Sequence, residues 1–150
     1  APMQVQQKVF NAQFQLAREW ERPCTIHVVK AWPEFMDELK EGVPSHWLLH
    51  SFGGSSEQLK GFADKGAYFS FGGAVIRHSN SEKLQNAVRK VPDDRLLLET
   101  DAPFQHPQGK DYRQEPTGLL RIAERIAELR GINIRDLSQK TERNLKHFIQ

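Results

Sequence analysis

Short apolar strands alternate with helical segments along the whole chain, and this alternation limits the fold more than any other feature of the sequence. Runs rich in β-branched, leucine and aromatic residues predict strands at 24–29, 47–50, 67–71 and 95–100. Apolar residues at helical spacing, with proline and glycine near the ends, predict helices at 4–20, 33–40, 56–65, 81–91, 117–130 and 135–149. Strands joined through helices form βαβ units with parallel strands. The sequence therefore predicts an α/β fold of about four parallel strands with flanking helices.

The number of strands leaves two architectures open. Four parallel strands can form a small open sheet or half of an eight-stranded TIM barrel, and secondary structure alone does not choose between them. The chain has 150 residues, of which 38% are hydrophobic and 27% charged, as is typical of one globular domain. We therefore expect a single domain over 1–150.

The charge balance excludes some classes of function. With 21 basic and 19 acidic residues, the net charge of +2 does not fit a basic protein that coats nucleic acid non-specifically. The apolar runs are too short to span a bilayer, and the polar N-terminal segment does not resemble a signal peptide. The single cysteine, Cys24, excludes an intramolecular disulfide and fits a reducing compartment. We expect a cytoplasmic or nuclear protein without a membrane partner.

Ionisable residues interrupt three of the apolar strands at their C-terminal ends. These residues are His27, His50, and Glu99 with Asp101. The C-terminal ends of parallel strands lie together in barrels and open sheets, so the two histidines and a carboxylate are expected to converge. Imidazole and carboxylate groups suit zinc, manganese and other divalent ions. Because strand side chains alternate, Glu99 and Asp101 face the same way, and one can bind metal while the other supports it or acts as a base.

Each of these residues also has an ordinary structural interpretation. A single histidine near a strand end is more often a hydrogen-bonded structural residue than a ligand, and Glu99 can simply pair with an arginine. The same pattern at three strand ends favours a shared site. Arg77, Lys110 and Arg113 are placed in loops after strands, where they can meet phosphate groups, although solvated surface residues are the commoner case.

Several motifs resemble those of one family, the TatD metal-dependent hydrolases, whose superfamily is amidohydrolase-like. The segment 96–103, LLLETDAP, resembles the L-L-E-T-D-x-P signature, and 50–54, HSFGG, is similar to H-x-F-x-G. The other matches are the helix-to-strand stretch from Phe10 through Pro23 to His27, the pair Glu115-Pro116, and a closing T-x-x-N-x-x-x-F at Thr141, Asn144 and Phe148. The resemblance covers nearly all of the chain.

The resemblance implies a TIM barrel, one or two divalent metal ions (Mg, Mn or Zn), and hydrolysis of phosphodiester bonds, typically in DNA. It implies that His27, His50 and Asp101 are metal ligands, and that Asp101 also orients or deprotonates the attacking water. We expect Glu99 to support this catalytic machinery. Substrate phosphates are expected to meet Arg77 and Arg113.

The chain also departs from the family pattern. The N-terminal H-x-H and G-E-x-G-L-D segments are absent, Val29 stands where the family often has arginine, and Gln114 replaces the usual asparagine. The sequence therefore predicts the C-terminal half of a TatD-type barrel, N-terminally truncated and incomplete for catalysis. A missing N-terminal half or a homodimer partner is expected to cover its open edges. One alternative is a non-catalytic truncated paralogue that acts as an interaction or self-associating module. A weaker alternative is another amidohydrolase-like reaction, such as lactone or amide hydrolysis.

Overall fold

The four expected strands form one parallel sheet in a computed structural model that describes residues 1–106, 108 and 112–150. The strands are β1 (Cys24–Ile26), β2 (Trp47–Leu49), β3 (Tyr68–Phe71) and β4 (Leu96–Leu98). They lie side by side in chain order, with Cys24 opposite Trp47, Leu48 opposite Tyr68, and Phe69 opposite Leu96. An open doubly wound sheet reverses its strand order at a switch point, whereas this unbroken order is that of a barrel segment.

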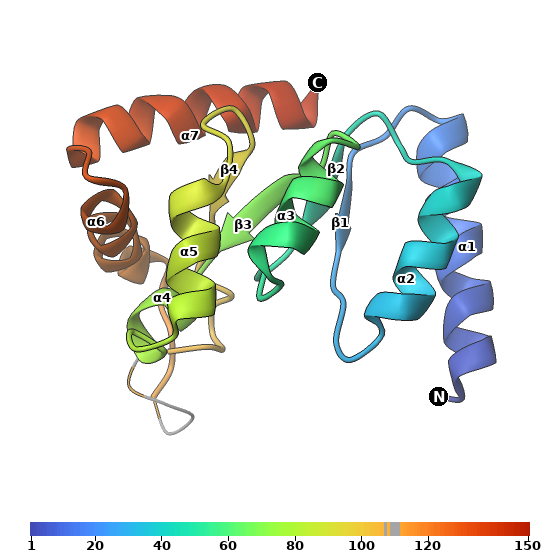
Figure 1. The fold of residues 1–150 in the computed structure, drawn as a ribbon, viewed down its shortest axis with the longest axis horizontal. Helices are drawn as coiled ribbons and strands as arrows, with labels where there is room; N and C mark the ends of the chain where they lie inside the picture. Colours follow the sequence, from blue (N-terminus) through green and yellow to red (C-terminus); the bar gives the residue numbers. More distant parts are fainter. Residues whose placement is uncertain (107, 109–111) are drawn as a thin grey trace.

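Helices precede, connect and follow the strands (Figure 1). They are α1 (Met3–Glu19), α2 (Trp32–Glu38), α3 (Ser56–Ala63), α4 (Ala74–Arg77), α5 (Glu82–Lys90), α6 (Leu119–Arg130) and α7 (Ile134–Ile149), with 3₁₀ turns η1 (Leu39–Glu41) and η2 (Pro116–Gly118). Right-handed crossovers between sequential parallel strands place the connecting helices on one face of the sheet. No helix in the described part of the chain is long and apolar enough to cross a membrane.

The main core lies between the sheet and these helices. Trp47, Phe69 and Leu96 point from the strands into it, and Phe62 of α3 packs against Trp47 with ring centroids 6.2 Å apart. All four side chains are fully or almost fully buried. Burial of each large apolar side chain contributes about 1.5–3 kcal/mol, so this layer holds the strands in register.

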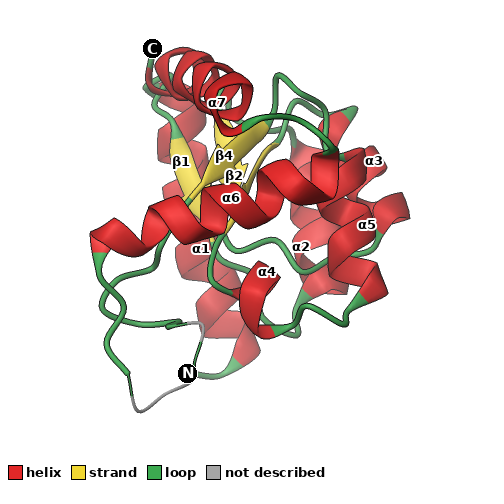
Figure 2. Cartoon of the chain, turned by 90° about the vertical axis from the view of Figure 1, so that its left-hand side faces the viewer, coloured by secondary structure: helices red, strands yellow, loops and turns green. Residues whose placement is uncertain are grey.

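The opposite face of the sheet would line the inside of a barrel. Leu48, Tyr68 and Leu97 point to this face, where they form a second, smaller cluster with Phe148 of α7. Figure 2 shows α7 at one end of the sheet, next to α6. The inner face therefore has only partial cover, and the apolar side chains there border a groove of about 490 Å³.

The structure corrects two expectations about the elements. The strands end at Ile26, Leu49 and Leu98, earlier than predicted, so the ionisable residues lie just beyond the strands rather than within them. The backbone turns out of the sheet there, with positive φ at Ser51 (50°) and Asp101 (57°). The segment after β3 also forms α4, which was not predicted, so Arg77 ends a short helix instead of lying in a loop.

Candidate metal centre

His50 lies at the centre of the candidate site. Its backbone N–H donates to the carbonyl of Ile26 at 2.9 Å, which extends the β1–β2 pairing by one residue and fixes the side chain at the inner face. On the ring, Nδ1 lies 2.7 Å from Glu99 Oε2, and Nε2 lies 3.6 Å from Asp101 Oδ1. One imidazole is thus placed between two carboxylates that both follow β4.

Glu99 is held from several sides. Its N–H donates to the carbonyl of Phe71 at 3.2 Å, and its Oε2 lies 2.7 Å from His50 Nδ1 and accepts a hydrogen bond from the hydroxyl of Ser70. Its Oε1 is buried and has no hydrogen-bond partner among the described residues. A Cβ at Gly72 would lie 2.9 Å from Glu99 Cγ, so glycine is required there for the carboxylate to occupy this position.

Asp101 approaches the same imidazole from the loop after β4. Its Oδ2 accepts a hydrogen bond from Gln105 Nε2 at 2.9 Å, which leaves Oδ1 directed toward His50. The Gln105 amide also contacts Ser51 Oγ at 3.4 Å and accepts a bond from Arg77 Nη2 at 3.3 Å. Gln105 therefore links Asp101 to the loop after β2 and to α4.

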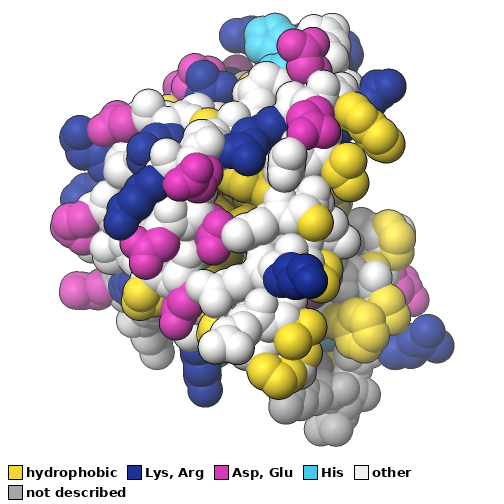
Figure 3. Space-filling view, turned by 90° about the vertical axis from the view of Figure 1, so that its right-hand side faces the viewer, with side chains coloured by type: hydrophobic (Ala, Val, Ile, Leu, Met, Phe, Trp, Pro, Cys, Tyr) yellow, Lys and Arg dark blue, Asp and Glu magenta, His cyan; other side chains and the backbone are white. Residues whose placement is uncertain are grey.

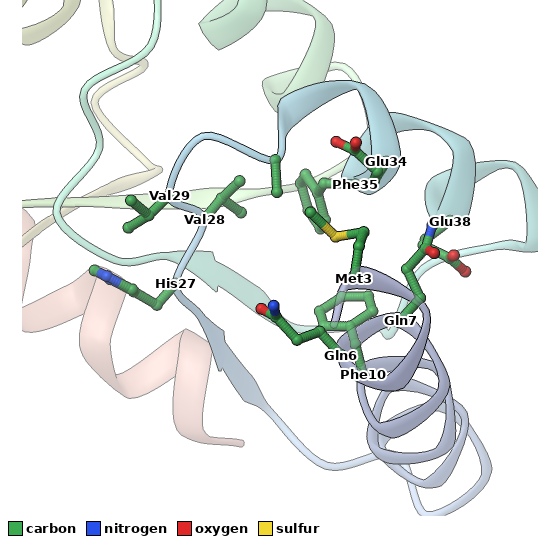
Figure 4. Close-up of a pocket in the computed structure, with 11 residues that line it drawn as sticks. Met3, Gln6, Gln7, Phe10, His27, Val28, Val29, Glu34, Phe35 and Glu38 are labelled. Carbon is green, nitrogen blue, oxygen red and sulfur yellow. The ribbon is translucent and has the colours of Figure 1, made fainter. Parts of the chain in front are cut away.

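His27 lies at the edge of the site. Its ring centroid is 5.4 Å from that of His50, and its side chain is exposed. Figure 4 shows its ring pointing away from Met3 and Phe10, which line a pocket of about 280 Å³ between α1 and α2. His27 is near His50 but has no carboxylate partner in the described part of the chain.

The donor set suits a divalent ion, although the side chains do not form a complete cage. Across residues 1–106, 108 and 112–150, no three His, Cys, Asp or Glu side chains are placed together closely enough to hold a metal. Ligands about 2.1 Å from a tetrahedral zinc lie about 3.4 Å from each other, close to the 3.6 Å between His50 Nε2 and Asp101 Oδ1. A carboxylate on Nδ1, as Glu99 provides, is the usual support of a metal-bound histidine. The His50–Asp101 pair fits an ion, and His27 would have to turn to join it.

A family model described as TatD related DNase matches residues 1–150. The chain belongs to the TatD family. The metal-dependent hydrolase YabD of Bacillus subtilis is 36% identical over 153 residues, which covers all of this chain and 60% of YabD. The 3'-5' ssDNA/RNA exonuclease TatD of Erwinia amylovora is 34% identical, covering 91% of this chain and 56% of that protein.

Solved TatD structures share the fold. YjjV, a TatD homologue from Escherichia coli K12, superposes with a TM-score of 0.88 at 26% identity, covering 97% of this chain and 57% of YjjV. A TatD family protein from Entamoeba histolytica superposes with a TM-score of 0.82 at 18% identity. The predicted α/β fold of a partial barrel is therefore confirmed. The chain spans less than two thirds of the length of these relatives, and the comparisons do not support its assignment to the C-terminal half, which rests on the motifs alone.

The structure brings most of the predicted TatD site residues together, but not all of them. His27, His50, Glu99 and Asp101 gather at one edge of the sheet, and Arg77 reaches this group through Gln105. Arg113 is exposed, and no hydrogen bond within the described residues joins it to this group. Lys110 lies outside the described residues.

Sequence reasoning missed Ser70, Gln105 and Gly72, which hold the carboxylates in place. Ser70 was detectable in principle, because it is the polar residue that follows Tyr68 on the inner side of an otherwise aromatic strand. Gln105 lies in an irregular loop, and no periodic pattern of residues marks it. Gly72 is needed only because Glu99 crosses above it, a contact that depends on the tertiary structure.

Proposed function

We propose that this chain is the C-terminal part of a TatD-type barrel and contributes to a metal-dependent deoxyribonuclease that hydrolyses phosphodiester bonds in DNA. The observation that supports it best is His50, whose two ring nitrogens face Glu99 and Asp101. Relatives named as metal-dependent hydrolases and as ssDNA/RNA exonucleases support the same reaction class. Because the chain spans 53–60% of the first relatives, catalysis is proposed for the complete barrel and not for this part alone.

In the proposed mechanism Glu99 and Asp101 have separate roles. Glu99 accepts the Nδ1–H of His50, so that the lone pair of Nε2 points toward Asp101 and is free for a metal ion. His50, Asp101 and, after a rotation, His27 would hold a divalent ion such as Mg, Mn or Zn. When bound, such an ion lowers the pKa of water and stabilises charge on the phosphate. Asp101 orients the attacking water and accepts its proton.

Arg77 is the better placed of the two predicted phosphate-binding residues. It is half-buried, and Gln105 connects it to Asp101. A guanidinium at this position can form bidentate hydrogen bonds with a phosphodiester and help to hold it beside His50 and Asp101. Arg113 would reach the substrate only from the solvent side of the loop, which predicts a smaller contribution.

The open inner face and free sheet edges support the proposal that residues 1–150 form one domain that needs a further barrel segment. In the described sheet, β1 and β4 each pair with one neighbour only. Such edges and an apolar inner face require cover. The missing N-terminal half would supply it, and a second copy of the chain is the alternative partner. The same surface also favours a second candidate function, a non-catalytic self-associating module.

Metal binding and nuclease activity distinguish the two candidates. We expect calorimetric titration with Zn²⁺ or Mn²⁺ to show binding to the chain, with at least tenfold weaker affinity in His50→Ala and no change in His147→Ala, which alters an exposed histidine on α7. Single-stranded and double-stranded DNA oligonucleotides labelled at the 5' end then test cleavage, alone and after addition of a TatD N-terminal half. No metal binding, with no cleavage in either mixture, would favour the non-catalytic module.

A further inference from the structure

β3 is the strand whose end provides no candidate metal ligand, yet it lies between β2 and β4, whose ends provide His50 and Asp101. Its inner-face residues are Tyr68 and Ser70, in register with Leu48 and Leu97 of the neighbouring strands. One inner-face step further along, β2 leads to His50, which is level with Ser70, and β4 leads to Glu99, which is level with Gly72. Ser70 therefore lies beside His50 on one strand, and the Glu99 carboxylate of the other neighbouring strand reaches back to the Ser70 hydroxyl.

The Ser70 hydroxyl is buried and has two hydrogen-bond partners. The side chain is 1% exposed, and Oγ accepts the backbone N–H of Ser51 at 3.3 Å. Since that N–H occupies a lone pair of Oγ, the hydroxyl proton is directed away from Ser51 and toward Glu99 Oε2, to which it donates. The direction of this hydrogen bond is thus set by the backbone of the loop after β2.

Ser70 restrains Glu99 because the carboxylate has few other partners. Oε1 has none among the described residues, so Oε2 alone faces both His50 Nδ1, at 2.7 Å, and the Ser70 hydroxyl. Without the hydroxyl, Glu99 would be held by His50 alone and could rotate. The proton on Nδ1 would then lose its fixed acceptor.

The same hydroxyl is connected to Asp101. Ser70 receives the N–H of Ser51, Ser51 Oγ contacts Gln105 Nε2 at 3.4 Å, and Gln105 donates to Asp101 Oδ2 at 2.9 Å. One buried serine therefore stands at the junction of two hydrogen-bonded arms, one to His50 through Glu99 and one to Asp101 through Gln105.

We propose that Ser70 is a positioning residue that acts through Glu99 to keep the proton of His50 on Nδ1, so that Nε2 remains available to a metal ion. This role rests on the proposed function of His50. It gives β3, which provides no ligand, a part in assembling the site. Buried supports of this kind are known to fix the tautomer and orientation of metal-binding histidines.

The tautomer of His50 in the metal-free chain tests this proposal directly. Long-range ¹H–¹⁵N correlation spectra at a pH where the imidazole is neutral report which ring nitrogen carries the proton, and His50→Gln assigns the signal. We expect the Nδ1–H form to dominate in the wild type. In Ser70→Ala the ratio of Nδ1–H to Nε2–H is expected to fall roughly three- to tenfold, the effect of losing one hydrogen bond of ordinary strength.

Two further variants separate positioning from a merely structural role. Ser70→Cys keeps a weaker donor of similar size and should give an intermediate ratio. Ser81→Ala deletes a hydroxyl that caps α5. It should leave the ratio unchanged, even if it lowers the melting temperature as much as Ser70→Ala does. An unchanged ratio in both Ser70 variants, or a wild type with the proton on Nε2, would overturn the proposal. Because no metal is needed, this result is independent of whether the chain binds Zn²⁺ or cleaves DNA.

Discussion

At the scale of single residues, Gly72 is the position where one added methyl group should disturb the candidate site most. A Cβ there would lie 2.9 Å from Glu99 Cγ and 3.3 Å from the Glu99 carbonyl oxygen. We expect Gly72→Ala to lower the free energy of unfolding by about 1–3 kcal/mol, as overpacking does, and to weaken Zn²⁺ binding. Gly53→Ala is the matched control, because a Cβ at Gly53 meets nothing within 4 Å. Denaturant unfolding and calorimetry of both variants measure the difference, and equal effects would argue against the contact.

Cys24 gives a second prediction at this scale. Burial raises the pKa of the Cys24 thiol to about 11 from 9.0, so the group is protonated and unreactive near neutral pH. At pH 8 the thiolate fraction is about a hundredfold below that of a thiol with the ordinary pKa. Alkylation by iodoacetamide should therefore be slow and should accelerate up to about pH 11. Rapid labelling at pH 8, with a plateau near pH 9, would show an accessible thiol instead.

The sequence indicates the candidate site residues more readily than the residues that hold them in place. His27, His50, Glu99 and Asp101 are unusual at the ends of apolar strands, so their types and positions alone indicate a function. Ser70 is a common residue in a strand, and its importance follows only from its contact with Glu99. The structure is needed to find residues whose role depends on a neighbour distant in sequence.

At the scale of elements, one buried polar side chain joins α7 to the sheet by hydrogen bonds, in addition to the apolar contacts of Phe148. Asn144 Nδ2 donates to the carbonyls of Asp93 and Leu96, both at 2.8 Å, at the start of β4. Asn144→Ala would leave both carbonyls without this donor and should cost about 2–3 kcal/mol of unfolding free energy. Lys146→Ala, which removes an exposed ion pair on the same helix, should cost about 0.3–0.5 kcal/mol. Similar midpoints of urea unfolding for the two variants would contradict the attachment.

Asp93 connects α6 and α7 through charged side chains. Its hydrogen bonds with Lys140 of α7 and Arg130 of α6 hold the pKa of the Asp93 carboxyl below its ordinary value of 3.8. Because the folded-state pKa is depressed, the stabilisation is present above pH 4 and is lost as the pH falls through the folded-state value. The difference in stability between wild type and Asp93→Asn should therefore be larger at pH 7 than at pH 2. It should also shrink in high salt, because the side chain is 56% exposed.

Element boundaries followed the sequence less closely than element types. The four strands and six longer helices lie where periodicity predicts them, since each buries an apolar face. β2 and β4 end early because the chain turns sharply after them at Ser51 and Asp101, where φ is positive. Four-residue α4 was missed because a segment this short carries no helical period.

At the scale of the whole molecule, the order of the strands decides between an open sheet and a barrel segment, and that order is a tertiary property. Alternating strands and helices predict parallel pairing, but they do not predict which strands become neighbours. The sequential order β1-β2-β3-β4, with an inner face that α7 covers only in part, is that of a partial TatD barrel. The resemblance in the motifs predicts this architecture, whereas the pattern of strands and helices alone does not.

The helix α1 of this partial barrel has an exposed apolar stripe. Four apolar side chains form this stripe: they lie within about 60° of one another around the helix or its C-cap, and they are 43–67% exposed. They are Val5, Val9, Leu16 and Trp20. Figure 3, which views the side where α1 and α2 lie, shows apolar side chains at the surface among charged ones. An apolar stripe beside the free edge of β1 favours association. We expect light scattering to show a mass that rises with concentration.

Substitutions on this stripe test the expectation. Val9→Lys combined with Leu16→Lys places two charges on it and should shift the molecule toward the monomer without lowering the melting temperature by more than a few degrees, because both positions are exposed. Gln4→Lys combined with Gln15→Lys adds the same charge to α1 away from the stripe, so it controls for repulsion between whole molecules. If both pairs reduce the mass equally, net charge explains the effect. If neither does, the contact between copies lies elsewhere, and the open inner face of the sheet becomes the surface to alter.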